Sequence, residues 1–291
     1  MHRIARRILP ALGLLLAGTA AEAQYTVYGV TNVAGQQQLV SFSSATPGAV
    51  TTLGATGANL TGIDFRPANG LLYGYDGSRV YTVSLTTGAA TLVGDIDDLT
   101  GGAGGVDFNP VADRLRLVDG AGTSLRVNVD ASTTIVDGSL AYAAGDPNAG
   151  SSPFVTAVAY TNSVAGAAST TLYGIDTRNG TLVTVNPPNN GTLNTVGSLG
   201  LGTLSAINGF DIVTVGGTNT AFFAALGAGS ISNLYTVNLG TGAATLVGAV
   251  NAGGGLAGIA AVATVPEPST WLLMGSGLLA VGAMARRRAR T

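Results

Sequence analysis

The sequence contains no cysteine and no lysine, and its only histidine, His2, lies at the very start of the chain. Its two glutamates, Glu22 and Glu267, also lie toward the ends. The long middle part therefore offers no thiolate, imidazole, amine or glutamate, which excludes serine triads, cysteine nucleophiles, Schiff bases and the usual zinc sites. Disulfides are excluded too, so stability must come from packing and backbone pairing.

Positive charge is also scarce once the two ends are set aside. Seven of the 13 arginines lie within residues 1–23 and 265–291, which leaves six in residues 24–264. The same middle span holds 13 aspartates, so its formal charge is −7. Because binding to nucleic acid or to an anionic membrane surface relies on basic patches, neither is expected as a partner of this span.

The first 23 residues have the pattern of a secretion signal. Three arginines precede an apolar run over residues 8–17, and Ala21 and Ala23 form a small-x-small cleavage site. The apolar run is too short for the alternative, a transmembrane helix. The sequence therefore predicts export and a mature chain that begins near Gln24.

The other end has a stop-transfer pattern. An apolar run over residues 271–285 follows the triplet Pro266, Glu267 and Pro268 and precedes four terminal arginines, which should stay cytoplasmic by the positive-inside rule. The run has 15 residues, fewer than the ~20 that a permanent span prefers. We expect a short transmembrane helix that anchors the chain transiently at the inner membrane.

This triplet, short helix and basic tail, over residues 265–291, resemble the PEP-CTERM sorting signal of Gram-negative bacteria. The resemblance implies an exosortase-type processing enzyme as a partner and delivery to the cell surface or an extracellular polysaccharide matrix. It also implies that membrane contact occurs only through the C-terminal helix. An ordinary C-terminal anchor is the alternative.

The middle part, residues 24–264, contains an internal repeat. Residues 81–94 recur as residues 235–248 with twelve of fourteen positions identical. Each copy has two short strands rich in β-branched residues around a Thr-Gly turn, which predicts a β-hairpin. Because a lone hairpin cannot bury its apolar face, the hairpins must pack against similar units.

The repeat extends to a four-strand unit. Residues 60–94 contain four short strands, and similar units begin near residues 105, 158 and 210. Residues 25–54 resemble a unit without its first strand, and residues 256–263 resemble a first strand alone. The sequence therefore predicts an all-β five-bladed β-propeller whose closing blade is shared between N- and C-terminal strands. A β-solenoid or a β-sandwich is the alternative.

Several runs in this body resemble the bacterial domain-of-unknown-function family numbered 4394, over nearly the whole mature span. The resemblance implies no activity and supplies no catalytic residues. The runs that carry it are residues 62–67, 140–150, 172–176 and 187–197.

One acidic loop is a weak candidate for calcium. Asp95, Asp97 and Asp98 place oxygen ligands close together between the second and third units. No twelve-residue loop with a terminal glutamate follows, so a solvated loop is the preferred interpretation. No metal and no cofactor is expected elsewhere.

Three of the body's six arginines fall in one unit. Arg114, Arg116 and Arg126 occupy positions that the preceding unit fills with apolar or neutral residues. With Asp119 nearby, they form a candidate site for the carboxylates or hydroxyls of an acidic glycan. The preferred alternative is that they form structural ion pairs with Asp113 and Asp119.

The composition favours a secreted, non-catalytic propeller that binds or organises components of the cell surface or extracellular polysaccharide. The contrasting hypothesis is a glycan hydrolase that uses aspartate pairs, since two carboxylates can support glycoside hydrolysis. Such enzymes generally use a glutamate as acid, and residues 24–264 contain none. No catalytic residue is therefore predicted.

Overall fold

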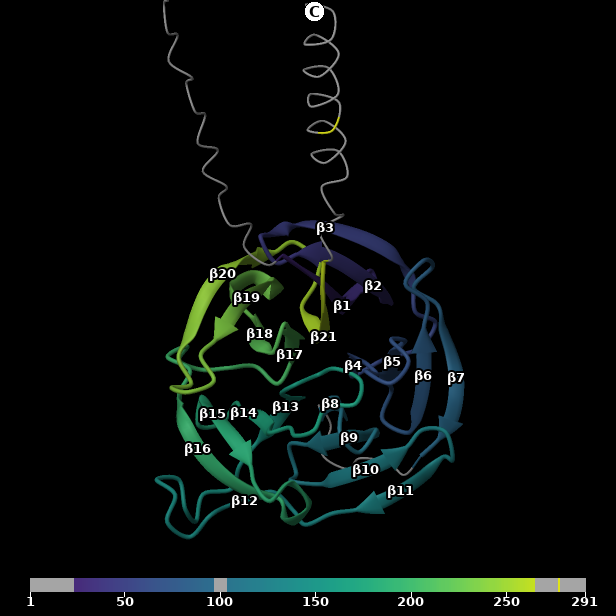
Figure 1. The fold of residues 1–291 in the computed structure, drawn as a ribbon. Coiled ribbons are helices and arrows are strands. Elements are labelled where there is room, and N and C mark those ends of the chain that lie inside the picture. Colours follow the sequence, from purple (N-terminus) through teal and green to yellow (C-terminus); the bar gives the residue numbers. More distant parts are fainter. Residues whose placement is uncertain (1–23, 97–103, 265–276, 278–291) are drawn as a thin grey trace, which may run out of the picture.

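The computed structural model describes residues 24–96, 104–264 and 277. Five sheets are arranged as blades around a central axis (Figure 1). The blades succeed one another along the chain, except that blade 1 joins strands from both termini. The predicted five-bladed propeller is confirmed, and the solenoid and sandwich alternatives are wrong.

Each blade starts with the strand that lines the channel and ends with an outer edge strand. The five inner strands contact one another around the ring. They are β21 (Leu256–Ala263) in blade 1, β4 (Gly62–Phe65) in blade 2, β8 (Gly104–Asn109) in blade 3, β13 (Val155–Tyr160) in blade 4 and β17 (Asn208–Val215) in blade 5.

The remaining strands follow outward in each blade. Blade 1 continues with β1 (Tyr25–Val33), β2 (Gln36–Ser43) and β3 (Thr46–Ala55), and blade 2 with β5 (Leu72–Tyr75), β6 (Arg79–Val83) and β7 (Ala90–Asp95). Blade 3 has β9 (Arg114–Asp119), β10 (Ser124–Asn128) and β11 (Thr133–Val136). Blade 4 has β14 (Leu172–Asp176), β15 (Thr181–Val185) and β16 (Thr192–Ser198), with β12 (Ala141–Tyr142) added in parallel, and blade 5 has β18 (Thr218–Leu226), β19 (Ser232–Val237) and β20 (Ala244–Val250).

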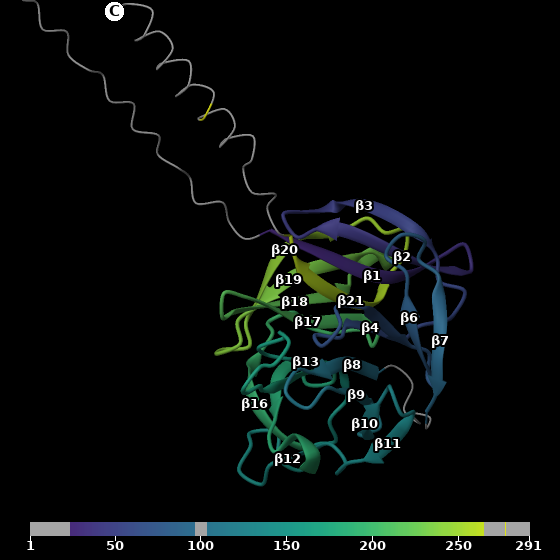
Figure 2. The ribbon, with the colours of Figure 1, turned by 45° about the vertical axis from the view of Figure 1, so that its right-hand side comes forward.

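The ring closes through β21 and β1, which lie side by side in both ribbon views (Figures 1 and 2). They pair in antiparallel register from Tyr25 opposite Ala263 to Val30 opposite Gly258. This pairing satisfies backbone groups that would otherwise form two open edges of an incomplete blade. The predicted split blade is therefore confirmed.

The core consists of five apolar clusters, one between each pair of neighbouring blades. Between blades 1 and 2, for example, Val30 and Leu39 pack with Ile63, Leu72 and Tyr81. The other four interfaces are built in the same way. Stability is therefore distributed around the ring, and each blade depends on both of its neighbours.

The repeated hairpins explain much of the glycine content. The β6–β7 and β19–β20 pairs carry a bulge at the same place, and the Thr-Gly turn of each one contacts the outer strand of the preceding blade. A Cβ on Gly54 would lie 2.1 Å from the carbonyl oxygen of Thr87, and a Cβ on Gly197 would lie 2.1 Å from that of Thr241. Glycine is needed where two backbones approach this closely.

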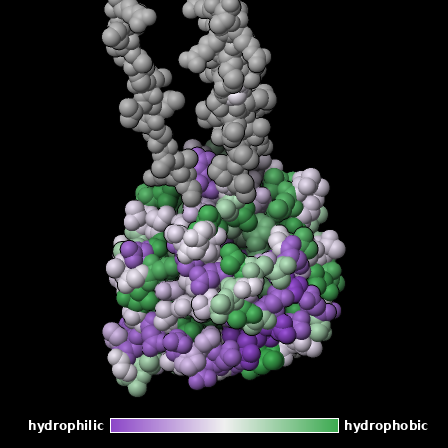
Figure 3. Space-filling model, viewed as in Figure 1, coloured by the Kyte–Doolittle hydropathy of each residue, from purple (hydrophilic) through white to green (hydrophobic). Residues whose placement is uncertain are grey.

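The surface of the ring mixes polar and apolar residues. In the view of Figure 3, hydrophilic residues gather along the lower edge, where blades 3 and 4 meet, and apolar residues are scattered elsewhere. The predicted secretion signal, sorting signal and C-terminal transmembrane helix lie outside the described residues. Among the residues that are described, no helix is long and apolar enough to cross a membrane.

Candidate binding cavity and aspartate cluster in the central channel

The five inner strands all begin at the same end of the channel. One cavity of about 450 Å³ is lined by a residue within one position of each strand's start: Thr61, Gly104, Thr156, Asn208 and Ala257. We refer to it as the mouth cavity. Its other lining residues come from the loops and strand ends of blades 1, 2 and 5: Asn32, Gln37, Asn59, Leu60, Ala206, Ile207, Leu226, Ser230 and Gly255.

Below the mouth cavity the channel narrows to a neck. Gly62, Gly105, Gly209 and Gly258 bring the inner strands close together, so that a Cβ on Gly105 would lie 2.5 Å from the backbone nitrogen of Val158. The remaining space in the neck is about 10 Å³, roughly what a single water molecule needs. A bulky ligand in the mouth cavity is therefore stopped at this level.

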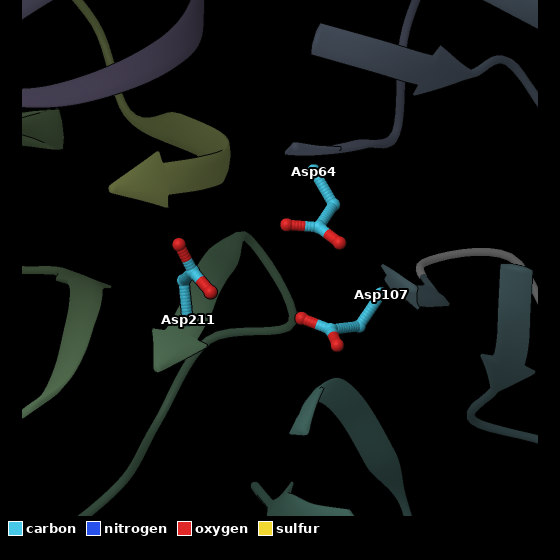
Figure 4. A group of neighbouring side chains, drawn as sticks. All are labelled: Asp64, Asp107 and Asp211. Carbon is cyan, nitrogen blue, oxygen red and sulfur yellow. The ribbon is translucent and has the colours of Figure 1, made fainter. Parts of the chain in front are cut away.

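Two residues beyond the neck, three buried aspartates point toward one another across the channel (Figure 4). Asp64, Asp107 and Asp211 each offer a carboxylate oxygen within 4.8 Å of the others. Asp107 accepts a hydrogen bond from the backbone amide of Tyr160 in blade 4, and Asp211 accepts one from that of Ala261 in blade 1. The residues just before these amides, Ala159 and Ala260, therefore lie at the level of the aspartates in the two remaining blades. We call the three carboxyls the aspartate cluster.

Each member of the aspartate cluster joins its own blade to the next one. Asp64 Oδ2 accepts a hydrogen bond from the backbone amide of Phe108 at 2.7 Å, and Asp107 Oδ1 accepts one from that of Tyr160 at 2.9 Å. Asp211 accepts from the backbone amides of Ala261 in blade 1 and of its own neighbour Ile212. The cluster therefore bridges blades 2 and 3, blades 3 and 4, and blades 5 and 1.

Burial shifts the proton affinity of all three groups. Desolvation, followed by the charge of Asp211, holds the pKa of Asp64 well above its usual value. Desolvation, followed by the charges of Asp64 and Asp211, does the same to the pKa of Asp107. Burial raises the pKa of Asp211 to about 6. The cluster can hold protons near neutral pH, and its all-oxygen donor set has the chemistry that hard cations prefer.

These aspartates were not predicted as a site, although the segments that contain them indicate the first strands of the blades. Gly62-Ile-Asp-Phe65, Gly105-Val-Asp-Phe108 and Gly209-Phe-Asp-Ile212 place an aspartate at the same position of three otherwise apolar inner strands. A charged residue that recurs within an apolar strand was the available signal. It became interpretable once the first strands were known to surround one channel.

Of the three predicted arginines, Arg116 is the most buried. It is 1% exposed, and its guanidinium donates to Tyr160 Oη, Ser124 Oγ, Asp137 Oδ2 and Asn189 Oδ1. The bonds to Tyr160 and Asn189 hold blade 3 against blade 4. Each guanidinium nitrogen makes at least one internal hydrogen bond, which fits a structural role for Arg116.

The other members of the predicted glycan site make internal contacts, and Arg126 lies opposite Arg116 in the β9–β10 pair. Arg126 makes a two-pronged contact with Asp137, at 2.7 and 2.8 Å. Arg114 donates to the backbone carbonyls of Ala112 and Asp113, while Asp119 is buried and accepts from the amides of Ala121 and Thr123. Arg116 and Arg126 thus share the carboxylate of Asp137, whereas the sequence had suggested Asp113 and Asp119 as partners. Asp113 pairs with Arg66 of blade 2 instead.

The remaining predicted positions lie at or beyond the limits of the described chain. Asp95 ends β7 and is exposed, whereas Asp97 and Asp98 lie outside the described residues. The cleavage residues Ala21 and Ala23 and the triplet at 266–268 also lie outside them. The calcium hypothesis for the acidic loop therefore remains a prediction.

The fold and the channel define a five-bladed β-propeller with a cavity at one end and a carboxyl cluster within. The family described as "Domain of unknown function (DUF4394)" matches residues 38–260, and the chain belongs to it. The PEP-CTERM protein-sorting motif matches residues 264–288, which marks an exported protein that an exosortase processes for the cell surface. Both predicted resemblances are confirmed.

Three of the solved structures that resemble this chain share 12–16% identity with it, and a search of curated proteins found no match. A Bacteroides thetaiotaomicron protein of unknown function shares 16% identity over 78% of this chain and 58% of its own length, with a TM-score of 0.44. Myxococcus xanthus glutaminyl cyclase shares 14% identity over 68% of this chain and 84% of its own, with a TM-score of 0.41. A Lactobacillus plantarum protein shares 12% identity over 81% of this chain and 98% of its own length, with a TM-score of 0.41.

Proposed function

We propose that this protein is a non-catalytic binding module that is displayed at the cell surface or in the exopolysaccharide matrix and engages matrix components through the mouth cavity. The sorting motif accounts for the location. The cavity accounts for the binding, because its volume of about 450 Å³ lies in the range of small-molecule sites in proteins.

The orientation of the cavity relative to the chain ends is the observation that carries this proposal. Gly255 and Ala257, at the start of β21, line the mouth cavity, whereas Ala263 at the other end of β21 pairs with Tyr25. Along an eight-residue strand these ends are about 23 Å apart. The chain therefore proceeds toward the sorting motif from the end of the channel opposite the cavity. A protein held by its C-terminal segment would present the cavity outward.

The chemistry of the channel supports binding in preference to catalysis. Among the described residues, those that line the mouth cavity include no aspartate, glutamate, histidine, lysine or arginine. The aspartate cluster lies beyond the neck, and its carboxyl oxygens are closer together than the ~5 to 9.5 Å that separates the carboxyl groups of glycosidases. The neck, with about 10 Å³ of free space, separates these carboxyls from a sugar ring in the mouth cavity.

Co-sedimentation of the exported protein with exopolysaccharide from the producing cells tests this function. We expect the protein to pellet with the polysaccharide, while the number of reducing ends in the polysaccharide stays constant over many hours. A protein that stays in the supernatant would contradict the binding role. A steady release of reducing ends would instead favour the hydrolase hypothesis.

A further inference from the structure

We infer that the mouth cavity binds the terminal sugar rings of an uncharged polysaccharide, an inference that rests on the proposed binding function. The cavity is large enough for a ligand of this kind, and the neck below it admits nothing larger than about one water. A chain end can therefore enter the cavity, but a polymer cannot thread through the ring.

The lining selects against charge. A charged ligand that enters a cavity without a counter-charge loses hydration that nothing replaces. The described residues that line the mouth cavity supply instead neutral amides and hydroxyls, together with aliphatic side chains. This chemistry matches the hydroxyl groups and C–H faces of a neutral sugar and disfavours uronic acids, phosphates and ammonium groups.

Asn208, at the inner end of the cavity, supplies an acceptor that needs a donor. It is 4% exposed, and its Nδ2 donates to Thr156 Oγ1 at 2.8 Å and to the carbonyl oxygen of Ser205 at 2.9 Å. These two bonds fix the orientation of the amide. Its Oδ1 is buried and has no donor among the described residues. A sugar hydroxyl, directly or through one water in the neck, provides that donor.

The opening of the cavity combines an apolar wall with free amides. Ile207 is 47% exposed and lies with Leu226 beside Gly255, which gives an aliphatic surface for the C–H face of a sugar ring. Asn32 of blade 1 and Asn59 of the loop into blade 2 are exposed and also line the cavity. Gln37 is not free for a ligand, because its amide is bonded to both backbone groups of Leu60.

A cavity-filling variant tests the inference. Ile207→Trp places a large side chain in the cavity from a position that is exposed, so the fold should be retained. Asn190→Ala changes an exposed asparagine of blade 4 that is not part of the lining and serves as the matched control. Both exported variants are compared with the parent protein on an array of neutral and uronic-acid oligosaccharides, after circular dichroism has verified their folding.

We expect the parent protein and Asn190→Ala to bind neutral oligosaccharides equally, and Ile207→Trp to bind them at least ~10-fold more weakly, a loss of about 1.4 kcal/mol. Binding only to uronic-acid oligosaccharides, or neutral binding that Ile207→Trp leaves unchanged, would overturn the inference. If Ile207→Trp fails to fold, the double variant Asn32→Ala with Asn59→Ala replaces it, with the same expected loss and the same refuting result.

The two proposals can fail separately. A protein that co-sediments with exopolysaccharide but binds no neutral oligosaccharide would retain the proposed function and lose this inference. A protein that neither co-sediments nor binds to the array would lose both.

Discussion

Replacing Asp107 with asparagine tests whether the aspartate cluster lowers the stability of the propeller at neutral pH. Asp107 Oδ1 accepts a hydrogen bond from the backbone amide of Tyr160, and the carboxyl group faces Asp64 and Asp211 across the channel. Asparagine retains an acceptor for that amide, removes one like charge and presents an NH₂ group to the two remaining carboxyls. We therefore expect Asp107→Asn to stabilise the protein at pH 7.

The magnitude follows from the pKa of Asp211, which rises from 3.8 to about 6 in the folded protein. At about 1.36 kcal/mol per pKa unit, this carboxyl alone changes the free energy of unfolding by about 3 kcal/mol. A raised folded-state pKa contributes stability that is fully present below the unfolded pKa and is lost as pH rises through the folded pKa. Stability should therefore fall between about pH 4 and pH 7. Asp107→Asn removes a second buried carboxyl, whose pKa is raised first by desolvation and then by the charges of Asp64 and Asp211, and should raise the stability at pH 7 by at least ~1 kcal/mol.

Urea unfolding between pH 4.5 and pH 8, in the presence of a chelator, measures this effect. Asp76, Asp130 and Asp146 have lowered pKa values, so their contributions are lost only at more acidic pH. The exposed Asp95→Asn serves as the control and should leave the profile unchanged. Parent stability that is flat or rises from pH 5 to pH 7 would refute the reasoning, as would an Asp107→Asn protein that is no more stable than the parent at pH 7.

Three further predictions concern the ring and the sorting signal. Deleting residues 256–263 removes the inner strand of blade 1 and should abolish the cooperative thermal transition, whereas an unchanged melting temperature would show that β21 does not close the ring. Gly197→Ala should lower the free energy of unfolding by ~1–3 kcal/mol, because its Cβ would lie 2.1 Å from the carbonyl oxygen of Thr241. Gly145→Ala is the control and should have little effect, because its Cβ would meet nothing within 4 Å. Equal stability of the two variants in urea would argue against close blade contact. Replacing Pro266-Glu-Pro268 with three alanines should trap unprocessed protein in the inner membrane of a host that has the sorting enzyme. Immunoblotting of cell fractions measures this. Normal surface release of the variant at the processed size would contradict the prediction.

The blade pattern could be predicted because it is local. Strand alternation, turn residues and the copies at 81–94 and 235–248 are all contained within short windows of sequence. The split blade followed from counting incomplete units at the two ends. The structure confirms both, and the pairing of Val27 with Ala261 is the direct evidence for closure.

The contacts that link different blades were less predictable. Arg116 bonds to Asp137, 21 positions away, and to Asn189, 73 positions away, so the aspartates nearest in sequence were the wrong partners to expect. The aspartate cluster was missed for the same reason, because its members are 43 or more residues apart and meet only when the ring closes. Sequence periodicity shows which side of a strand is buried but not which blade lies opposite.

Hydroxyl-radical footprinting of the exported protein, free and bound to exopolysaccharide from the producing cells, tests the central claim most directly. The labelled positions of interest are two side chains that line the mouth cavity, the exposed Ile207 and the half-buried Leu226. The account predicts that bound polysaccharide protects these two residues and leaves the outer edge residues Leu92 and Leu246 labelled as in the free protein. Protection of the edge strands with unchanged labelling at Ile207 and Leu226 would contradict it.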